Sequence, residues 1–330
     1  MHLVVVMPAL NEAATIADVV RAVPRDIASI DRVSVIVVDD GSTDATAAEA
    51  RSAGAKVVSH GRNLGLGRAF ATGVDAALKA GADLMVNIDS DGQFNPGTIP
   101  RLIAPILEGK ADFVSCSRFG DPALVPVMPA VKLWGNRQMT RLVNLIVRPR
   151  KKFTDVSCGF RAYTRETLLR LNLYGSFTYT QETFTDLAYK GLRMEEVPLP
   201  VRGVRQFGQS RVARNLWNYA LQTSTILLRS LRDYRPLFFF GVLSAAFMIL
   251  ALAQLGVVTI HWLGTGKTTP FTSLIVTGST TFLSSILLLA VALLADMQGR
   301  SRRIQEQLLY LAKRAYYDQS SESVKGSTNQ

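Results

Sequence analysis

Two long uncharged apolar segments constrain this chain more than any other feature of its sequence. Residues 237–260 and residues 270–295 contain no Asp, Glu, Lys or Arg. Each is longer than the ~20 residues that a helix needs to cross the hydrocarbon core of a bilayer. Core helices of soluble proteins are usually shorter and carry a polar stripe, so two buried core helices are the weaker alternative. The sequence therefore predicts a hairpin of two transmembrane helices.

Basic residues flank this predicted hairpin on both sides. Residues 202–235 hold seven Arg against one Asp, and residues 297–330 hold six Lys and Arg against three acids. The short connection between the apolar segments carries a single Lys, so the positive-inside rule places both ends of the hairpin in the cytoplasm. Residues 1–12 lack the basic start of a signal peptide, which predicts an integral membrane protein with its N-terminal domain and both termini cytoplasmic.

The chain divides into four expected parts. Residues 1–208 form a cytoplasmic α/β domain, and residues 209–235 show apolar and Arg-rich faces at helical spacing. That pattern is typical of a helix lying in the membrane interface, with packing on the soluble domain as the alternative. Residues 236–296 form the hairpin, and residues 297–330 form a basic tail. The polar composition at the end of that tail is typical of a disordered segment. The net charge of +11 thus points to a lipid bilayer as a partner, and no nucleic acid partner is expected.

The first 200 residues alternate apolar strand-like runs with helical stretches, the pattern of a mostly parallel sheet covered on both faces. The expected strands are residues 3–8, 32–40, 55–60, 83–89 and 111–118. They end at Pro8, Asp39, His60, Asp89 and Arg118, and ligands of open α/β sheets bind beyond such strand ends. The chain has no GxGxxG after its first strand and no Walker loop, which argues against dinucleotide-binding and P-loop enzymes.

Two carboxylates stand close together after the fourth expected strand. Asp89 and Asp91 are two residues apart, so they face the same way in an extended segment, and Gln93 follows two residues later. Three interpretations are open for this cluster: a solvated turn, a general acid/base pair, or a site for a hard divalent cation completed by phosphates. Asp39 and Glu12 stand beyond neighbouring strands, which adds weight to the cation site.

Several motifs in order resemble the family 2 nucleotide-sugar glycosyltransferases, which have the type A fold. The motifs are VVMPALNEAATI, VVDDGSTDAT, NLGLGRAF and NIDSDGQFNP, followed by SCGFRAYTRE, QETFTDLAYKGLRMEEVPL and RQFGQSR. The later ones resemble the branch that transfers a sugar to polyprenyl or dolichyl phosphate, as in dolichyl-phosphate mannose synthase and bacterial polyisoprenyl-phosphate glycosyltransferases. The resemblance covers about residues 3–211. It implies a membrane-anchored hexosyltransferase that inverts the anomeric carbon and uses a nucleotide sugar of the UDP-glucose or GDP-mannose type.

The resemblance also implies roles for individual residues. Residues that would bind the nucleotide are Pro8, Leu10 and Glu12 in the first loop, Val37 and Asp39 at the second strand, and Ser90 between the two acids. Asp89, Asp91 and Gln93 would bind the divalent metal, Mg or Mn, together with the diphosphate. Leu10 replaces the family's usual aromatic and Ser90 its usual Ala, so stacking of the base on Leu10 is not expected.

An acceptor phosphate is already an anion, so the reaction implied by the resemblance needs cations more than a general base. The candidates for holding phosphates are Arg118, Lys132, Arg137 and Arg205, of which Arg118 and Arg205 are expected to be catalytic with Asp91. Arg202 is the weaker alternative to Arg205, and no His is expected to be catalytic. Gln181 and Glu182 would lie near the sugar and acceptor, with Ser157, Gly159 and Arg161 lining the same pocket or serving the structure alone.

Two other functions and two minor features complete the expectations. The chain could instead glycosylate a hydroxyl of a glycan or glycolipid, although it lacks a QxxRW motif, or it could be a nonenzymatic membrane scaffold.

Cys116 and Cys158 lack metal-ligand spacing and are expected to be reduced packing residues. Small and hydroxyl residues in the second apolar segment would allow packing into a homo-oligomer.

Overall fold

The computed structural model describes residues 1–149, 152–173, 179–203, 225, 228, 231–232 and 235–328, with side chains as far as residue 319. It divides into two compact units. The first comprises Met1–Leu227 together with Leu309–Gln330, and the second comprises Leu228–Leu308. The segment expected to form the amphipathic helix, residues 209–235, lies almost wholly outside the described residues.

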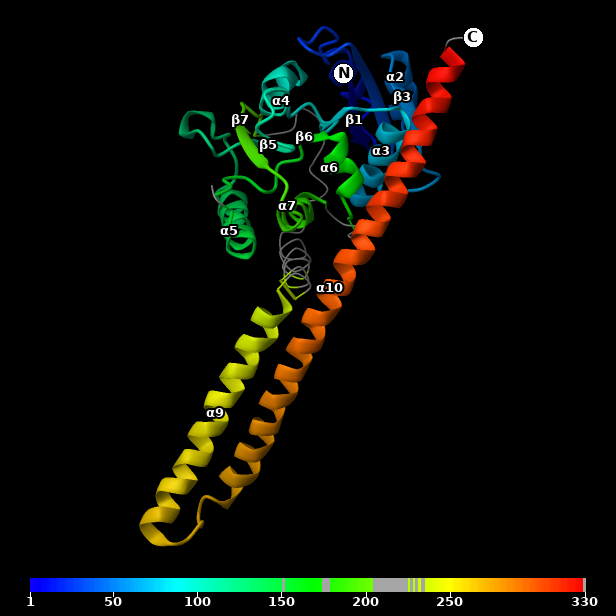
Figure 1. Cartoon of the computed structure of the whole chain (residues 1–330). Coiled ribbons are helices and arrows are strands. Elements are labelled where there is room, and N and C mark those ends of the chain that lie inside the picture. The colour runs from blue at the N-terminus through cyan, green and yellow to red at the C-terminus, as the bar shows by residue number, and fades with distance from the viewer. Residues whose placement is uncertain are drawn as a thin grey trace. The chain divides into compact units, whose positions relative to one another are not determined.

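The first unit is built on a seven-stranded sheet with the strand order β3-β2-β1-β4-β6-β5-β7 (Figure 1). The strands are β1 His2–Ala9, β2 Arg32–Asp39, β3 Lys56–Ser59, β4 Leu84–Asn87, β5 Phe113–Ser117, β6 Arg161–Thr164 and β7 Met194–Pro198. Only β6 runs against its neighbours, so the carboxyl ends of the other six strands lie at one edge of the sheet. The mostly parallel α/β architecture predicted from the sequence is confirmed.

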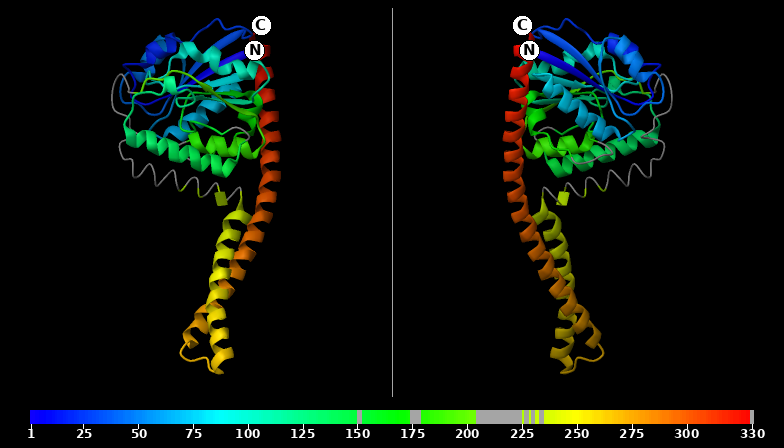
Figure 2. Two further views of the ribbon diagram at one scale, coloured as in Figure 1. Left: turned by 90° about the vertical axis from the view of Figure 1, so that its left-hand side faces the viewer. Right: turned by 90° about the vertical axis from the view of Figure 1, so that its right-hand side faces the viewer.

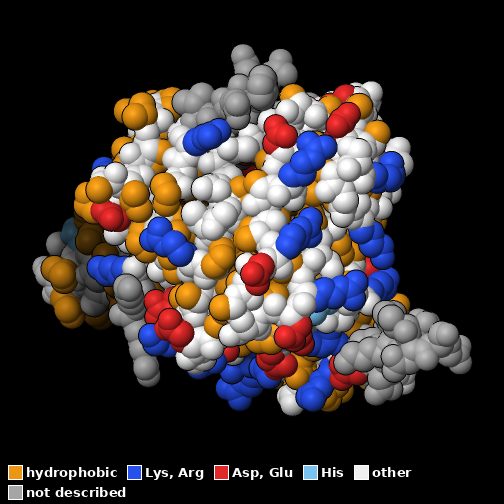
Figure 3. All heavy atoms as spheres, turned by 90° about the horizontal axis from the view of Figure 1, so that it is seen from above, with side chains coloured by type: hydrophobic (Ala, Val, Ile, Leu, Met, Phe, Trp, Pro, Cys, Tyr) orange, Lys and Arg blue, Asp and Glu red, His pale blue; other side chains and the backbone are white. Residues whose placement is uncertain are grey.

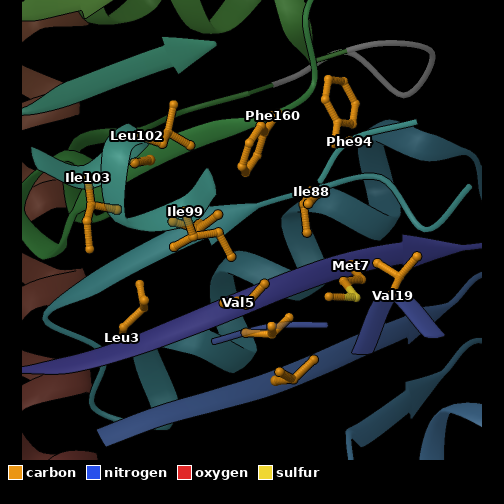
Figure 4. Packing of buried hydrophobic residues seen from close by; sticks show 14 of the residues in the cluster. Leu3, Val5, Met7, Val19, Ile88, Phe94, Ile99, Leu102, Ile103 and Phe160 are labelled. Carbon is orange, nitrogen blue, oxygen red and sulfur yellow. The ribbon is translucent and has the colours of Figure 1, made fainter. Parts of the chain in front are cut away.

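Helices cover both faces of this sheet (Figure 2). They are α1 Ile16–Arg21, α2 Thr46–Ser52, α3 Leu66–Lys79, α4 Ile99–Leu107, α5 Ala130–Val147, α6 Arg165–Arg170 and α7 Thr180–Tyr189, with the short 3-10 turns η1 Pro96–Thr98 and η2 Pro122–Leu124. Leu3, Val5 and Met7 of β1 pack in one core cluster with residues of α1, α2 and α4 (Figure 4). The alternate residues of the sheet face α3 and α7, which bury a second apolar layer.

The second layer depends on a close approach between α3 and β1. A Cβ atom added to Gly73 in α3 would lie 2.3 Å from Cγ1 of Val6 in β1. Nearby, the rings of Phe70 and Tyr179 stack with centroids 4.0 Å apart. The absence of a side chain at Gly73 therefore sets the distance between this helix and the sheet.

Gly73→Ala is expected to destabilise the first unit by about 1–3 kcal/mol, because the added methyl overpacks the interface with Val6. Gly135→Ala in α5 is the matched control, since a Cβ atom there would meet nothing within 4 Å. That control is expected to stabilise its helix by up to about 1 kcal/mol through helix propensity alone. Thermal or urea unfolding in detergent measures both, and equal effects of the two substitutions would contradict the packing argument.

Two strands of the sheet domain, β6 and β7, are absent from the sequence-based expectation. The first helix, α1, begins at Ile16, several residues after the end of β1 at Ala9. Asn11 adopts a positive φ of 53° and accepts a hydrogen bond from the Thr43 N–H at 2.8 Å, which ties it to the neighbouring loop instead of a helix. Local hydrogen bonding by Asn competes with helix formation in this way.

The C-terminal part of the chain packs on the sheet domain within the first unit. Tyr310 donates a hydrogen bond to Glu166 of α6 at 3.0 Å, and Tyr317 donates one to Asp75 of α3 at 2.7 Å. The ammonium group of Lys313 donates to the Leu171 carbonyl at 3.0 Å and to the Asn172 side chain at 2.9 Å. Burial lowers the pKa of Lys313. Charge alone did not predict this docking of the basic tail.

From residue 236 onward, the second unit contains two long apolar helices. They are α9 Pro236–Thr265 and the first part of α10 Thr272–Thr328, and both are long and apolar enough to cross a membrane. At 1.5 Å per residue, the 30 residues of α9 extend about 45 Å. The hydroxyl of Ser244 donates to the Ser285 carbonyl at 2.9 Å, and Ser285 donates back to Ser244 at 3.0 Å. Such reciprocal bonds between small residues are typical of helix pairs in membranes. The helix α10 extends to Thr328, into the segment that composition predicts to be disordered.

Charged side chains of both signs are distributed over the face of the sheet domain that the space-filling view shows (Figure 3). Lys and Arg side chains on that face are interspersed with Asp and Glu rather than gathered into one broad basic patch (Figure 3). A broad basic patch is the electrostatic signature of nucleic-acid binding.

Candidate active site

The loop after β4 is held against the end of β1. Ser90 donates a side-chain hydrogen bond to the Pro8 carbonyl at 2.9 Å, and Thr15 donates one to the Ser90 carbonyl at 2.7 Å. Ser90 is 3% exposed, so these bonds are made away from water, where a lost partner is costly. Two of the predicted strand ends therefore meet, and Ser90 fixes the position of the acids on either side of it.

Asp89 and Asp91 occupy the predicted position beyond β4. Asp91 is 3% exposed and accepts a hydrogen bond from the Gln93 N–H at 3.0 Å, across a turn in which Gly92 has a φ of 72°. The Asp89 carboxylate lies against the backbone of Gly159, where an added Cβ atom would stand 2.9 Å from one carboxylate oxygen. Gly159 is thus required by the close approach of the carboxylate to the chain.

The two acids after β2 have separate roles. Asp39 is 5% exposed and accepts the Ser42 N–H at 3.0 Å, at the same sheet edge as Asp89. Asp40 accepts the N–H groups of Leu64 and Gly65, each at 2.9 Å, and it pairs with the His60 imidazole at 2.7 Å. Asp40 therefore anchors the loop before α3, whereas Asp39 is the acid of this pair that fits a nucleotide role.

Two hydrogen bonds join the acidic loop to the segment after β7. The Arg202 N–H donates to the Gln93 backbone carbonyl at 3.0 Å, and the side-chain nitrogen of Gln93 donates to the Arg202 carbonyl at 3.2 Å. A groove of about 550 Å³ lies beside this bridge, between α1 and residues 92–96 and 200–202. Arg202, the weaker candidate for a phosphate-binding arginine, is therefore bonded directly to the acidic loop. The preferred candidate, Arg205, lies outside the residues that the structure describes.

The donor set at this loop fits a hard divalent cation in its chemistry. It offers the carboxylates of Asp89 and Asp91 and the side-chain oxygen of Gln93. The side-chain nitrogen of Gln93 already donates a hydrogen bond to the Arg202 carbonyl. Mg and Mn favour such oxygen ligands. Among the described residues, no three His, Cys, Asp or Glu side chains converge into a preformed cage, so further oxygen ligands such as phosphate or water would complete the coordination. The metal assignment itself stays a prediction.

Arg118 lies at the end of β5 and forms a two-pronged ion pair with Asp155. Its Nε donates to one carboxylate oxygen at 2.6 Å and its Nη2 to the other at 2.9 Å. Asp155 is fully buried, and the Arg118 side chain is 18% exposed. Burial by itself would lower the pKa of Arg118. The adjoining Asp155 carboxylate outweighs that effect, so the pKa of Arg118 lies above its usual value. The guanidinium therefore stays charged and is fixed in orientation at the sheet edge.

A half-buried glutamate supports this pair from behind. Glu196 of β7 accepts hydrogen bonds from the Thr154 N–H at 2.6 Å, the Thr154 hydroxyl at 2.8 Å and the Asp155 N–H at 2.9 Å. Burial raises the pKa of Glu196, although these hydrogen bonds act in the opposite direction. The strap that carries Asp155 is thus fixed to β7 as well as to Arg118.

Several other predicted site residues are buried, and two lie on α5. Val37 is fully buried in the core cluster, and Gln181 is fully buried on α7, where its amide donates to the Ser157 hydroxyl at 3.3 Å. Arg161 is also fully buried and donates to two backbone carbonyls of the segment before it. Lys132 and Arg137 lie on α5 and form no ion pair with another described residue.

Sequence reasoning did not single out three residues that shape the site. Asp155 orients Arg118, Thr15 holds Ser90, and Tyr179 accepts a hydrogen bond from the Asn87 amide at 2.7 Å beneath the acidic loop. Burial raises the pKa of Tyr179, and the charge of Asp89 adds to that shift. The available signal for Asp155 was an isolated acid in a basic stretch, directly before the SCGFRAYTRE motif.

The two cysteines lie behind the site as buried free thiols. The Cys116 N–H donates to the Phe160 carbonyl at 2.9 Å, and both cysteines belong to the main core cluster. A hydrogen bond with Cys158, together with burial, raises the pKa of the Cys116 thiol. Their role as reduced packing residues agrees with the expectation from the sequence.

Comparison with known sequences places the chain in a family. The model of glycosyl transferase family 2 matches residues 4–171. The UDP-N-acetylglucosamine–dolichyl-phosphate N-acetylglucosaminyltransferase of Methanococcus voltae is 30% identical over 180 residues, which cover 49% of this chain and 69% of that protein. The polyprenol monophosphomannose synthase of Mycolicibacterium smegmatis is 28% identical over 221 residues, covering 63% and 80% respectively.

Solved structures give the same answer for the fold. Glucosyl-3-phosphoglycerate synthase from Mycobacterium tuberculosis, in complex with Mn²⁺, UDP and glucosyl-3-phosphoglycerate, aligns with a TM-score of 0.55 and 25% identity. The alignment covers 69% of this chain and 79% of that one. The family match and the relatives confirm the resemblance seen in the motifs, including the branch that acts on polyprenyl and dolichyl phosphates. The chain is a glycosyltransferase that belongs to glycosyl transferase family 2.

Proposed function

We propose that this protein is a membrane-anchored inverting glycosyltransferase that moves one hexose from a nucleotide sugar to polyprenyl or dolichyl phosphate. The product is a lipid-phosphate-linked monosaccharide. The observation that carries the proposal is that one sheet edge holds both a fixed acidic loop after β4 and a fixed arginine after β5. The acidic loop suits a metal-bound diphosphate, and the arginine suits an acceptor phosphate.

The donor half of the site is assigned to the loops after β1, β2 and β4. Pro8, Glu12 and Asp39 would contact the nucleoside, while Asp89, Asp91 and Gln93 would hold Mg or Mn. Held by these residues, a metal ion would supply positive charge to the departing nucleoside diphosphate. The bonds that hold Ser90 and Asp91 support this assignment, because they fix the carboxylates before the ligand binds. The complex of the related synthase with Mn²⁺ and UDP supports a divalent metal.

The acceptor half is assigned to Arg118. Its bonds to Asp155 use Nε and one N–H of Nη2, so Nη1 or the second Nη2 N–H would reach a phosphate oxygen. An anionic acceptor attacks without a general base. The His60 imidazole agrees with this chemistry, because it is engaged between Asp40 and the Thr72 hydroxyl. Arg205, Lys132 and Arg137 remain candidates for further phosphate contacts, with Arg202 as the alternative to Arg205.

Membrane attachment is assigned to the hairpin of α9 and α10. A polyprenyl chain stays in the bilayer, so a transferase that uses it gains by residing there. The apolar helices and the basic flanking residues support a cytoplasmic catalytic domain with both termini on the same side. The names of the dolichyl-phosphate and polyprenol relatives support the lipid acceptor.

The test is a transfer assay with the full-length protein in detergent. A panel of UDP and GDP sugars is offered with Mg or Mn and a short-chain polyprenyl phosphate, and lipid-linked sugar is measured by mass spectrometry. One nucleotide sugar is expected to give a monosaccharide phosphate lipid. Transfer only to a free lipid or glycan hydroxyl would favour the hydroxyl-acceptor alternative, and absence of any metal-dependent nucleotide binding would favour a scaffold.

A further inference from the structure

One arginine of the sheet domain is buried without a carboxylate partner. Arg161, the first residue of β6, is fully buried, and no Asp or Glu among the described residues forms an ion pair with it. Its Cζ atom lies 4.9 Å from the centroid of the Phe184 ring and 5.7 Å from that of Phe113. Its Nη1 atom has no hydrogen-bond partner in the described part of the chain. Burying a charge in this way costs stability, and an apolar side chain of similar size would suit the same aromatic surroundings.

The hydrogen bonds of Arg161 within the described residues both go to one turn of the backbone. Its Nε donates to the Cys158 carbonyl at 2.8 Å, and its Nη2 donates to the Val156 carbonyl at 3.0 Å. The planar guanidinium presents its donors in a rigid fork, so it holds two carbonyls in one fixed arrangement. Arg161 therefore fixes the turn of the strap that carries Asp155, residues 154–160.

The acceptor half of the site is attached to one end of this turn. Asp155 comes directly before Val156, and its carboxylate accepts the bond from Nε of Arg118 at 2.6 Å. The Ser157 N–H donates back to the Asp155 carboxylate at 3.2 Å, so the turn also holds that carboxylate. A shift of the turn would therefore move the guanidinium of Arg118.

The donor half of the site is attached to the other end of the turn. Gly159 directly follows Cys158, and the Asp89 carboxylate lies so close to it that an added Cβ atom would stand 2.9 Å from a carboxylate oxygen. Asn87, which is paired with Arg161 across β4 and β6, donates to the Gly159 carbonyl at 2.9 Å. A shift of the turn would therefore also displace the surface against which Asp89 lies.

We propose that Arg161 is a positioning residue: by holding the turn of the strap, it keeps the guanidinium of Arg118 and the carboxylate of Asp89 in place together. Because it is fully buried, it acts only through those two side chains. The inference rests on the proposed function, since it takes Asp89 as a ligand of the donor's metal and Arg118 as a contact of the acceptor phosphate. The buried charge is then explained by the geometry of the site rather than by the stability of the fold.

The test separates misplacement of the site from loss of folded protein. Arg161→Met fills a similar space and removes the donors. The full-length protein in detergent is titrated with UDP and GDP in Mn²⁺ by calorimetry, and the KM for polyprenyl phosphate is measured in the transfer assay. We expect the Kd of the bound nucleotide and the KM of the acceptor each to rise at least about tenfold, as is typical when a residue that orients a ligand is removed. The unfolding temperature of the metal-free protein is expected to change little, because the lost hydrogen bonds and the removed buried charge act in opposite directions.

Three further proteins serve as controls. Arg161→Lys keeps the charge but cannot hold two carbonyls in a rigid fork, so both constants are expected to rise less than in Arg161→Met. Arg165, directly after β6 at the opposite edge of the sheet, pairs with Asp318 at 3.0 Å, and Arg165→Met is expected to leave both constants within a factor of about two. In an Asp89→Asn background, Arg161→Met is expected to change the nucleotide Kd by less than about twofold, because the carboxylate through which it acts is altered.

The outcomes divide clearly. Fewer nucleotide sites per protein with an unchanged Kd and KM would show a purely structural role and overturn the proposal, as would unchanged binding and transfer, or a rise in only one of the two constants. If Arg161→Met does not fold, Arg161→Lys decides: raised constants support the proposal, whereas unchanged constants or a second failure to fold overturn it. If the unmodified protein binds nucleotide but makes no lipid-linked sugar, the proposed function fails, and the nucleotide Kd still decides whether Arg161 acts on Asp89.

Discussion

Asp91→Asn is expected to lower the rate of sugar transfer by roughly 100-fold or more, the range seen when a group that stabilises developing charge is removed. The substitution keeps the size of the side chain and an oxygen that can accept the Gln93 N–H. It removes only the negative charge assigned to the metal. Steady-state kinetics at saturating Mg or Mn, together with a thermal unfolding curve, measures the effect.

A matched control separates this effect from general loss of charge. Asp112 precedes β5 at the opposite edge of the sheet and pairs with Arg193 at 2.7 Å. Asp112→Asn is expected to leave transfer unchanged within a factor of about two, since such partly exposed ion pairs contribute about 0–1 kcal/mol. An Asp91→Asn protein that folds normally and keeps full activity would refute the metal role of this acid.

Asp155→Ala is expected to destabilise the catalytic domain by about 3–5 kcal/mol, because it leaves the largely buried Arg118 guanidinium without its counter-charge. The double variant Arg118→Met with Asp155→Asn removes both charges and is expected to recover most of that stability. The double variant should nevertheless lose transfer, since no guanidinium remains for the acceptor phosphate. Urea unfolding and the KM for polyprenyl phosphate measure the two effects separately.

The pair Arg193 and Asp112 provides the comparison for this experiment as well. It is two-pronged like the pair of Arg118 and Asp155, but the Arg193 side chain is 58% exposed. Asp112→Ala is expected to cost no more than about 1 kcal/mol. If the double variant bound polyprenyl phosphate as well as the unmodified protein does, Arg118 would be a structural residue and the acceptor would need another cation.

The predicted strands came from a simple physical pattern. β1, β2, β4 and β5 are nearly continuous apolar runs that end in Pro, Asp or polar residues, as expected for strands buried on both faces. β6 gave no such signal because its residues, RAYT, begin with Arg161 and form no apolar run. That arginine is tolerated inside because it bonds to backbone carbonyls and lies 4.9 Å from the Phe184 ring, a contact that no local pattern reveals.

The site was predicted where its residues follow strands and missed where partners come from distant segments. The acids after β4 could be located because DxD at a strand end has a geometric meaning. The partner of Arg118 could not, since Asp155 is 37 residues away and no spacing rule joins them. Gln181, which the resemblance placed near the sugar and acceptor, is fully buried on α7 with its side chain bonded to Ser157, and its role there stays a prediction.

The metal-dependent nucleotide site is tested most directly by a calorimetric titration of UDP and GDP into the full-length protein, with Mn²⁺ present or removed by a chelator. We expect one nucleotide to bind tightly with the metal, its binding to fall at least about tenfold without the metal, and Asp89→Asn to abolish the difference. Nucleotide binding of equal strength with and without metal, or no binding of either nucleotide, would contradict the assignment of the loop after β4.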